Sequence, residues 1–226
     1  MNYWQLIVSI TLYFTTLVGL TCYKRIKPTS AKVFVLWYIV WALADIGFYV
    51  YQGFFSNGNR GNVMKVVQIT YCLLDPFYYL TYAYVFLLVH QPINLIQRFI
   101  WVVFVFFLSF SFYQLAHQLD ERSIANDSFL IKSILILLIV LYYFWTLIQS
   151  NQIIIPSKEP LFWIATGSLF FFTGNIISSG FFHELFSYSK EWARILFKLS
   201  YILEIVLYLF SILAFVISSK RENNGR

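Results

Sequence analysis

Apolar residues form long, almost uninterrupted runs along the whole chain, and short polar stretches separate each run from the next. Crossing the hydrocarbon core of a bilayer, about 30 Å thick, takes about 20 apolar residues in a helix. Since lipid offers no partner for backbone groups, a run that crosses must be helical. Seven runs have this length, within a few residues at each end: 3–22, 33–53, 66–89, 99–116, 130–149, 161–181 and 195–218. We therefore predict an all-α fold, a seven-transmembrane-helix bundle that forms a single domain over residues 1–226.

The composition changes this picture little and excludes several classes of protein. Of the 226 residues, 60% are hydrophobic and 12% are charged, whereas a soluble domain is about 25% charged. The net charge of +6 does not indicate nucleic-acid binding, because the basic residues lie at the ends of the apolar runs, where membrane orientation explains them. The predicted environment is the lipid bilayer, and no nucleic acid is expected as a partner.

The distribution of lysine and arginine predicts an orientation. Basic residues crowd the first loop and the end of the chain, which seven spans place on the same side: Lys24, Arg25, Lys27, Lys32, Lys220, Arg221 and Arg226. The fourth loop is acidic on balance and lies on the other side. Because basic loops stay in the cytoplasm, we predict the N-terminus outside and the C-terminus inside. Trp37, Trp101, Trp145 and Trp163 lie near the inner ends of their helices, as an interfacial aromatic belt would.

Three acidic residues lie deep in the apolar runs: Asp45 in the second, Asp75 in the third and Glu204 in the seventh. Each costs about 2.5 kcal/mol or more at a helix centre, so none should face lipid. Their depths from the outer helix ends are about 12, 14 and 14 Å at the helical rise of 1.5 Å per residue. This common level predicts a shared polar site in the outer half of the bundle.

Helical spacing adds other polar side chains to the same faces, because residues three or four apart share a face. The candidate ligand- or proton-binding residues are Asp45, Asp75, Glu204, Asn175, Tyr71, Tyr79, Tyr201 and Tyr208. Spans one and five, by contrast, look almost purely apolar. Phenols and carboxylates can satisfy one another without water. Burial and like-charge proximity disfavour the charged form, so we expect at least one carboxylic acid to be neutral and the site to exchange a proton or accept a cation.

A structural role for these acids stays open, since buried carboxylic acids can simply fix helix packing through hydrogen bonds. Pro76, directly after Asp75, is expected to kink its helix. Gly167 and Gly174 lie two turns apart on the sixth span and are expected to allow close helix packing. The histidines are peripheral, and no metal-ligand spacing, phosphate loop or nucleophile elbow is present. We therefore expect no cofactor, no metal and no enzymatic activity.

A short pattern recurs in two spans and suggests an internal repeat. Leu74-Asp75-Pro76-Phe77-Tyr78-Tyr79-Leu80 aligns without gaps on Leu203-Glu204-Ile205-Val206-Leu207-Tyr208-Leu209. Both segments read Leu, acid, three residues, Tyr, Leu. The match suggests two parallel units of three helices joined by the fourth span, a 3+1+3 arrangement with the site between the units.

Three segments resemble a group of uncharacterised bacterial seven-span membrane proteins. They are Ala44-Asp45-Ile46-Gly47, the stretch from Leu74 to Tyr79, and Phe162-Trp163-Ile164-Ala165-Thr166-Gly167. The genes of this group often accompany histidine-kinase or response-regulator genes, so the resemblance implies a signalling association and a location in the bacterial cytoplasmic (inner) membrane. The chain departs from the group at Asp75-Pro76, where a glutamate followed by phenylalanine is more usual.

These observations favour a non-enzymatic membrane sensor or signal-relay protein that binds a small ligand, cation or proton at intramembrane carboxylates. Since no effector domain is attached, its output is expected to pass to a cytoplasmic or membrane signalling partner such as a histidine kinase. The alternative is a proton- or cation-coupled small-solute transporter or channel that uses the same carboxylates. An intramembrane hydrolase and a structural subunit of a larger complex are further alternatives.

Overall fold

A computed structural model describes residues 3–26, 29–54, 60–88, 94–118, 126–149 and 158–220. Its regular elements within these ranges are all helical, so the predicted all-α fold is confirmed. The helices are α1 (Tyr3–Cys22), α2 (Thr29–Phe54), α3 (Arg60–Ala83), α4 (Asn94–Gln118), α5 (Asn126–Gln149), α6 (Pro160–Tyr188) and α7 (Lys190–Lys220). A π-helical turn, η1 (Tyr84–Leu88), continues α3. Each predicted apolar run falls on one of these helices, except that the third continues from α3 into η1 and its last position, 89, lies outside the described residues.

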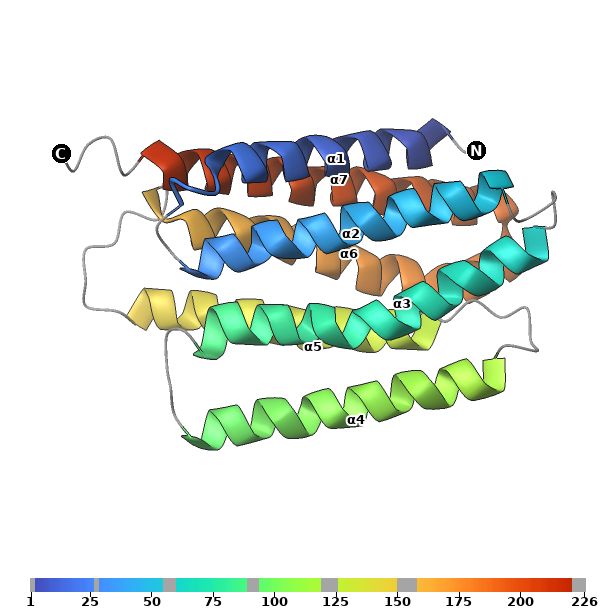
Figure 1. The fold of residues 1–226 in the computed structure, drawn as a ribbon. Helices are drawn as coiled ribbons and strands as arrows, with labels where there is room; N and C mark the ends of the chain where they lie inside the picture. Colours follow the sequence, from blue (N-terminus) through green and yellow to red (C-terminus); the bar gives the residue numbers. More distant parts are fainter. Residues whose placement is uncertain are drawn as a thin grey trace.

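The helices lie side by side and run alternately in opposite directions, so that α1 begins at one end of the bundle and α7 ends at the other (Figure 1). Each helix packs against its neighbours in the chain, and contact between α1 and α7 closes the series into a ring. In Figure 1, α1, α2 and α3 lie in front of α7, α6 and α5, with α4 at one edge. Helix α4 packs mainly on α3, which also contacts α2 and α5.

Aromatic side chains fill the centre of the ring. The rings of Phe34 and Tyr82 meet edge-on with their centroids 5.0 Å apart, and Tyr82 meets Phe172 in the same way at 5.7 Å. Such edge-to-face pairs add about 0.5–1.5 kcal/mol each beyond the area they bury. All three side chains are almost completely buried, so the core joins α2, α3 and α6.

The outer surface of the bundle is apolar as well. Large side chains such as Leu43, Phe106, Leu138 and Leu209 are exposed on α2, α4, α5 and α7. Soluble monomers rarely expose contiguous apolar patches larger than a few hundred Å², so a surface of this kind suits lipid.

Within the part of the chain that the structure describes, six helices are long and apolar enough to cross a membrane: α1, α2, α4, α5, α6 and α7. They indicate an integral membrane protein. Helix α3 is not among the six. It has 24 residues and includes Arg60, Lys65 and Asp75, which lower its mean hydropathy. That α3 is a seventh span is therefore a proposal.

One local expectation meets a different outcome. Trp37 does not belong to an interfacial belt, because its ring is buried in the core against Trp41 and Tyr78. Pro76 lies inside α3, and the α-helix continues through it to Ala83. The kink expected at Pro76 stays a prediction, and the π turn η1 follows the end of the α-helix.

Candidate functional site

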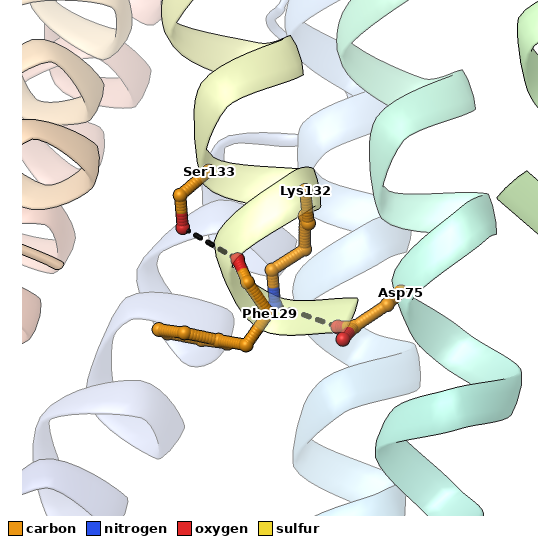
Figure 2. Close-up of polar contacts among 4 residues, drawn as sticks. All are labelled: Asp75, Phe129, Lys132 and Ser133. Carbon is orange, nitrogen blue, oxygen red and sulfur yellow. Dashed lines mark hydrogen bonds and ion pairs between the residues drawn. The ribbon is translucent and has the colours of Figure 1, made fainter. Parts of the chain in front are cut away.

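A buried ion pair joins α3 to α5. The ammonium group of Lys132 donates a hydrogen bond to Oδ1 of Asp75 over 2.6 Å (Figure 2). The exposed fractions are 3% for Lys132 and 1% for Asp75. The burial of an isolated charge costs about several kcal/mol in desolvation. Pairing with an opposite charge offsets this cost and allows both groups to be buried.

Aromatic rings complete the surroundings of the ammonium group. Lys132 Nζ lies 4.3 Å from the centroid of the Phe129 ring and 5.3 Å from that of Tyr78. Phe129 belongs to the same helix, one turn away, and its carbonyl accepts the hydroxyl of Ser133 (Figure 2). Ring faces attract cations, so the charge is held between a carboxylate and two rings.

The interpretation of span five as almost purely apolar is therefore wrong. Lys132 lies close to the outer end of the predicted run, where a lysine commonly extends its charge to the membrane surface. A signal was present in the sequence, because an intramembrane carboxylate requires a partner and Lys132 is a cation within an apolar run. Ser128 of α5 is also buried, close to Asp75.

Asp45 is bonded to α1, which the sequence analysis also treated as almost purely apolar. The Tyr13 hydroxyl donates to Oδ2 of Asp45 over 2.7 Å, and the hydroxyls of Ser9 and Tyr49 lie 3.0 Å apart one turn further along. Span one thus supplies polar partners to α2, contrary to the expectation. Asp45 is half-buried.

Glu204 has a partner on its own helix. The Tyr208 hydroxyl donates to Oε1 of Glu204 over 2.9 Å, and the ring of Tyr208 packs edge-on against Tyr38 of α2. Glu204 itself is half-buried. The three carboxylates therefore bond to different groups: Asp75 to a lysine, Asp45 and Glu204 to tyrosines.

Tyr71 nevertheless links the three acids, since its phenol lies within electrostatic range of Glu204, Asp75 and Asp45. Glu204 is also within electrostatic range of Asp45 and of Lys132. We call these five residues the carboxylate site. It is built by α2, α3, α5 and α7, so groups from four helices share one region of the bundle.

The remaining candidate residues divide into two groups. Tyr201 and Tyr208 lie within electrostatic range of Glu204. Tyr79 is turned towards α4, where its ring meets Phe107 edge-on. Its position follows from the helical turn of 100° per residue, which carries Tyr79 away from the face shared by Tyr71 and Tyr78.

Asn175 is buried on α6, with an exposed fraction of 2%, and its side-chain nitrogen has no hydrogen-bond partner in the structure. On the next turn of α6, the Ser178 hydroxyl accepts a hydrogen bond of 2.8 Å from Ser200 of α7. This contact sets the register of the two helices. One turn further into the bundle, the same faces carry Asn175 and Glu204.

Burial changes sharply along one face of α3. The exposed fraction is 7% at Tyr78, 1% at Asp75 and 43% at Tyr71. The change takes place within one helical turn, on the side towards which α3 begins. Asp75 therefore belongs to the buried core, whereas Tyr71 is exposed and Asp45 and Glu204 are half-buried.

Chemically, the site offers two half-buried carboxylates beside an ion pair that is already complete. Such an arrangement can exchange a proton or hold an added positive charge. Among the residues that the structure describes, no group of three histidine, cysteine or acidic side chains is placed to hold a metal ion. Comparison with protein-family models, curated proteins and solved structures gives no match for this chain.

Proposed function

We propose that this protein is a non-enzymatic membrane sensor or signal-relay protein in which a proton, cation or small ligand engages Asp45 and Glu204 from the outer side. The observation that carries the proposal is the position of these two carboxylates, within electrostatic range of each other. Lys132, which lies within electrostatic range of Glu204, is paired with Asp75. Two like charges in a poorly solvated place favour the uptake of positive charge.

Binding would be felt by several helices, because the bonds that surround the site connect different helices. Asp45 holds α1 through Tyr13, and Asp75 holds α5 through Lys132. A change of charge at Glu204 alters the electrostatic forces on Asp45 and on Lys132. Such a change can shift helix packing between two arrangements.

In this proposal the chain crosses the membrane seven times and its N-terminus faces outward. Helix α3 is the seventh span, although it is less apolar than the other six helices. The basic turn after α1, with Lys24 and Arg25 exposed, then lies in the cytoplasm, as the distribution of positive charge favours. A signalling partner such as a histidine kinase would contact this side, in the inner membrane of a bacterium.

Infrared difference spectroscopy on the protein in lipid nanodiscs tests the proposal. Between acidic and neutral pH we expect a carboxyl band that disappears in Glu204→Gln and stays in Glu191→Gln, a control at an exposed position of the same helix. Hydrogen exchange of the turn after α1 should change over the same pH range. A spectrum without a Glu204-dependent band, or an inner turn that does not respond, would contradict the sensor.

A proton- or cation-coupled transporter is the second candidate, and the buried Lys132–Asp75 pair favours it, since intramembrane ionisable pairs mark ion and proton pathways. Reconstituted liposomes distinguish the two functions. Uptake of a cation or proton driven by a pH gradient, and abolished in Glu204→Gln, would establish transport. A Glu204-dependent infrared band in a protein that shows no flux would favour the sensor.

A further inference from the structure

We propose that the carboxylate site binds an organic ammonium ion, a protonated amine with a neighbouring hydrogen-bond acceptor, between Glu204, Asp45 and the ring faces of Trp41 and Tyr71. This inference rests on the proposed function and names the class of ligand that the same site takes.

The charges of the site call for a cation. The carboxylate site contains three carboxylates and one lysine, and that lysine is in direct contact with Asp75. The remaining negative charge lies on Asp45 and Glu204, which act on each other electrostatically. A cation between them removes their repulsion, whereas an anion adds to it.

Aromatic rings indicate that this cation is organic. The rings of Trp41 and Tyr71 lie 5.6 Å apart at an interplanar angle of 44°, and neither side chain is fully buried. Ring faces of tryptophan and tyrosine attract alkylammonium groups, whose weak hydration allows them to leave water. Lys132 illustrates the same chemistry within the protein, because its own ammonium lies over the rings of Phe129 and Tyr78.

Two buried donors without partners indicate that the ligand also carries an acceptor. The side-chain nitrogen of Asn175 is one, on the turn of α6 that is level with Glu204 through the Ser178–Ser200 contact. The indole nitrogen of Trp41 is the other. An unpaired buried donor costs about 1–3 kcal/mol, and a hydroxyl or carbonyl oxygen on the ligand would satisfy it.

The access route follows from the exposure of Tyr71. Its exposed fraction is 43%, next to 1% at Asp75 one turn away, and Asp45 and Glu204 are half-buried. A ligand that enters at Tyr71 meets this ring first and the ion pair last, so binding does not require a continuous path through the bundle.

Binding of phenylalaninol to the full-length protein in nanodiscs, measured by calorimetry and by thermal stabilisation, tests the inference. Phenylalaninol carries an ammonium group and a hydroxyl, and 3-phenylpropan-1-ol is its neutral counterpart. We expect the amine to bind at least about tenfold more tightly than the neutral alcohol, a difference of about 1.4 kcal/mol. This comparison uses the wild-type protein, so it does not depend on a variant that folds.

Variants then locate the site. Glu204→Gln should weaken binding of phenylalaninol about tenfold or more, and Tyr71→Leu should weaken it severalfold while Tyr71→Phe keeps it, because the ring face acts without the hydroxyl. Asn175→Leu should remove the preference for phenylalaninol over phenylethylammonium, which lacks the hydroxyl. Glu191→Gln is the matched control and should bind as the wild type does.

Equal affinity for the amine and the neutral alcohol, or unchanged binding in Glu204→Gln, would overturn the inference. If the Glu204-dependent carboxyl band of the previous section is present while no amine binds, the ligand class is wrong and the sensor stands. If the band is absent too, both proposals fail.

Discussion

At the scale of single residues, the most consequential contact is the 2.6 Å pair between Lys132 and Asp75. Transfer of two charges out of water costs several kcal/mol per ion, about as much as their attraction returns. Such a pair adds little stability compared with apolar residues of the same volume. What it does is make each partner dependent on the other, so that α3 and α5 are held in one register.

Removal of one partner should therefore be far more costly than removal of both. We expect Lys132→Met to lower the free energy of unfolding by about 3–5 kcal/mol, because Asp75 is left as an unpaired charge. Lys132→Met with Asp75→Leu should lie within about 1.5 kcal/mol of the wild type. Thermal and denaturant unfolding in detergent measure both, with Lys65→Met, at an exposed position of α3, as the control. A double variant as unstable as the single one would show that the pair is not governed by charge.

The tyrosine–serine pairs of the core have a fixed donor direction. Ser211 donates its hydroxyl hydrogen to the carbonyl of Leu207, so in the 2.6 Å contact between Tyr38 and Ser211 the tyrosine is the donor. Ser168 likewise donates to Ile164 and accepts from Tyr82. These chains end on backbone carbonyls, and they therefore lock the helices and do not pass protons onward.

This direction predicts an asymmetry between the two partners. Tyr38→Phe leaves Ser211 bonded to Leu207 and should cost about 1 kcal/mol, the net worth of one hydrogen bond. Ser211→Ala leaves the buried hydroxyl of Tyr38 without an acceptor. It should therefore cost more, up to about 3 kcal/mol. The double variant should resemble Tyr38→Phe in a double-mutant cycle of unfolding free energies. Equal costs for the two single changes would reverse the assigned direction.

The acids could be predicted from the sequence because each interrupts a long apolar run, and Glu204 with Tyr208 follows from helical spacing. Their partners could not, since Tyr13 and Lys132 lie 32 and 57 positions from the residues they contact. Lys132 near a helix end is compatible with both an exposed and a buried charge, and the packing of α5 against α3 decides between them. The same holds for Trp37, whose position near a helix end suggested an interface although the ring is in the core.

At the scale of helices, α6 and α7 approach most closely where α6 has glycine. A Cβ added at Gly167 would lie 2.8 Å from Cβ of Phe210 and 3.3 Å from Cα of Leu207, so α7 would have to move. A Cβ at Gly174 would collide with the flexible end of the Leu203 side chain and not with the backbone of α7. The spacing of the two glycines predicts close packing at both, because small residues let the backbones of neighbouring helices approach.

Alanine substitutions should separate these environments. Gly167→Ala should destabilise the protein by about 1–3 kcal/mol, the usual cost of overpacking, and Gly174→Ala should cost less. Gly47→Ala on α2 is the matched control, because nothing lies within 4 Å of the added atom. There, alanine should be neutral or stabilising by up to about 1 kcal/mol through its higher helix propensity. A Gly167→Ala protein that unfolds like the wild type would contradict the close approach in the structure.

Helix α3 packs against three other helices, α2, α4 and α5. Its charged residue Asp75 faces α5 rather than lipid, and its tyrosines Tyr78 and Tyr82 are buried among rings. A helix shielded by protein needs less apolar surface than one that faces lipid. This explains why the length of the apolar run predicts a span at α3 while its mean hydropathy does not.

At the scale of the whole molecule, the closed ring places the start of α1 and the end of α7 at opposite ends (Figure 1). Exposed basic residues cluster at the end of α1, at Lys24 and Arg25, and α7 ends with Lys220 at the same end of the bundle. If all seven helices cross the bilayer, the two chain ends lie on opposite sides. If α3 does not cross, they lie on the same side.

Labelling of single cysteines in intact bacterial cells distinguishes these arrangements. Cys22 and Cys72 are free thiols and are first replaced by alanine, after which Asn2→Cys or Asn223→Cys is introduced. We expect a membrane-impermeant maleimide to label position 2 in intact cells and position 223 after permeabilisation, because positive charge keeps the basic end of the bundle in the cytoplasm. Labelling in the reverse order would keep seven spans and invert the protein. Equal labelling of both positions would remove α3 from the membrane, and with it the outward opening at Tyr71 through which a ligand would reach Glu204.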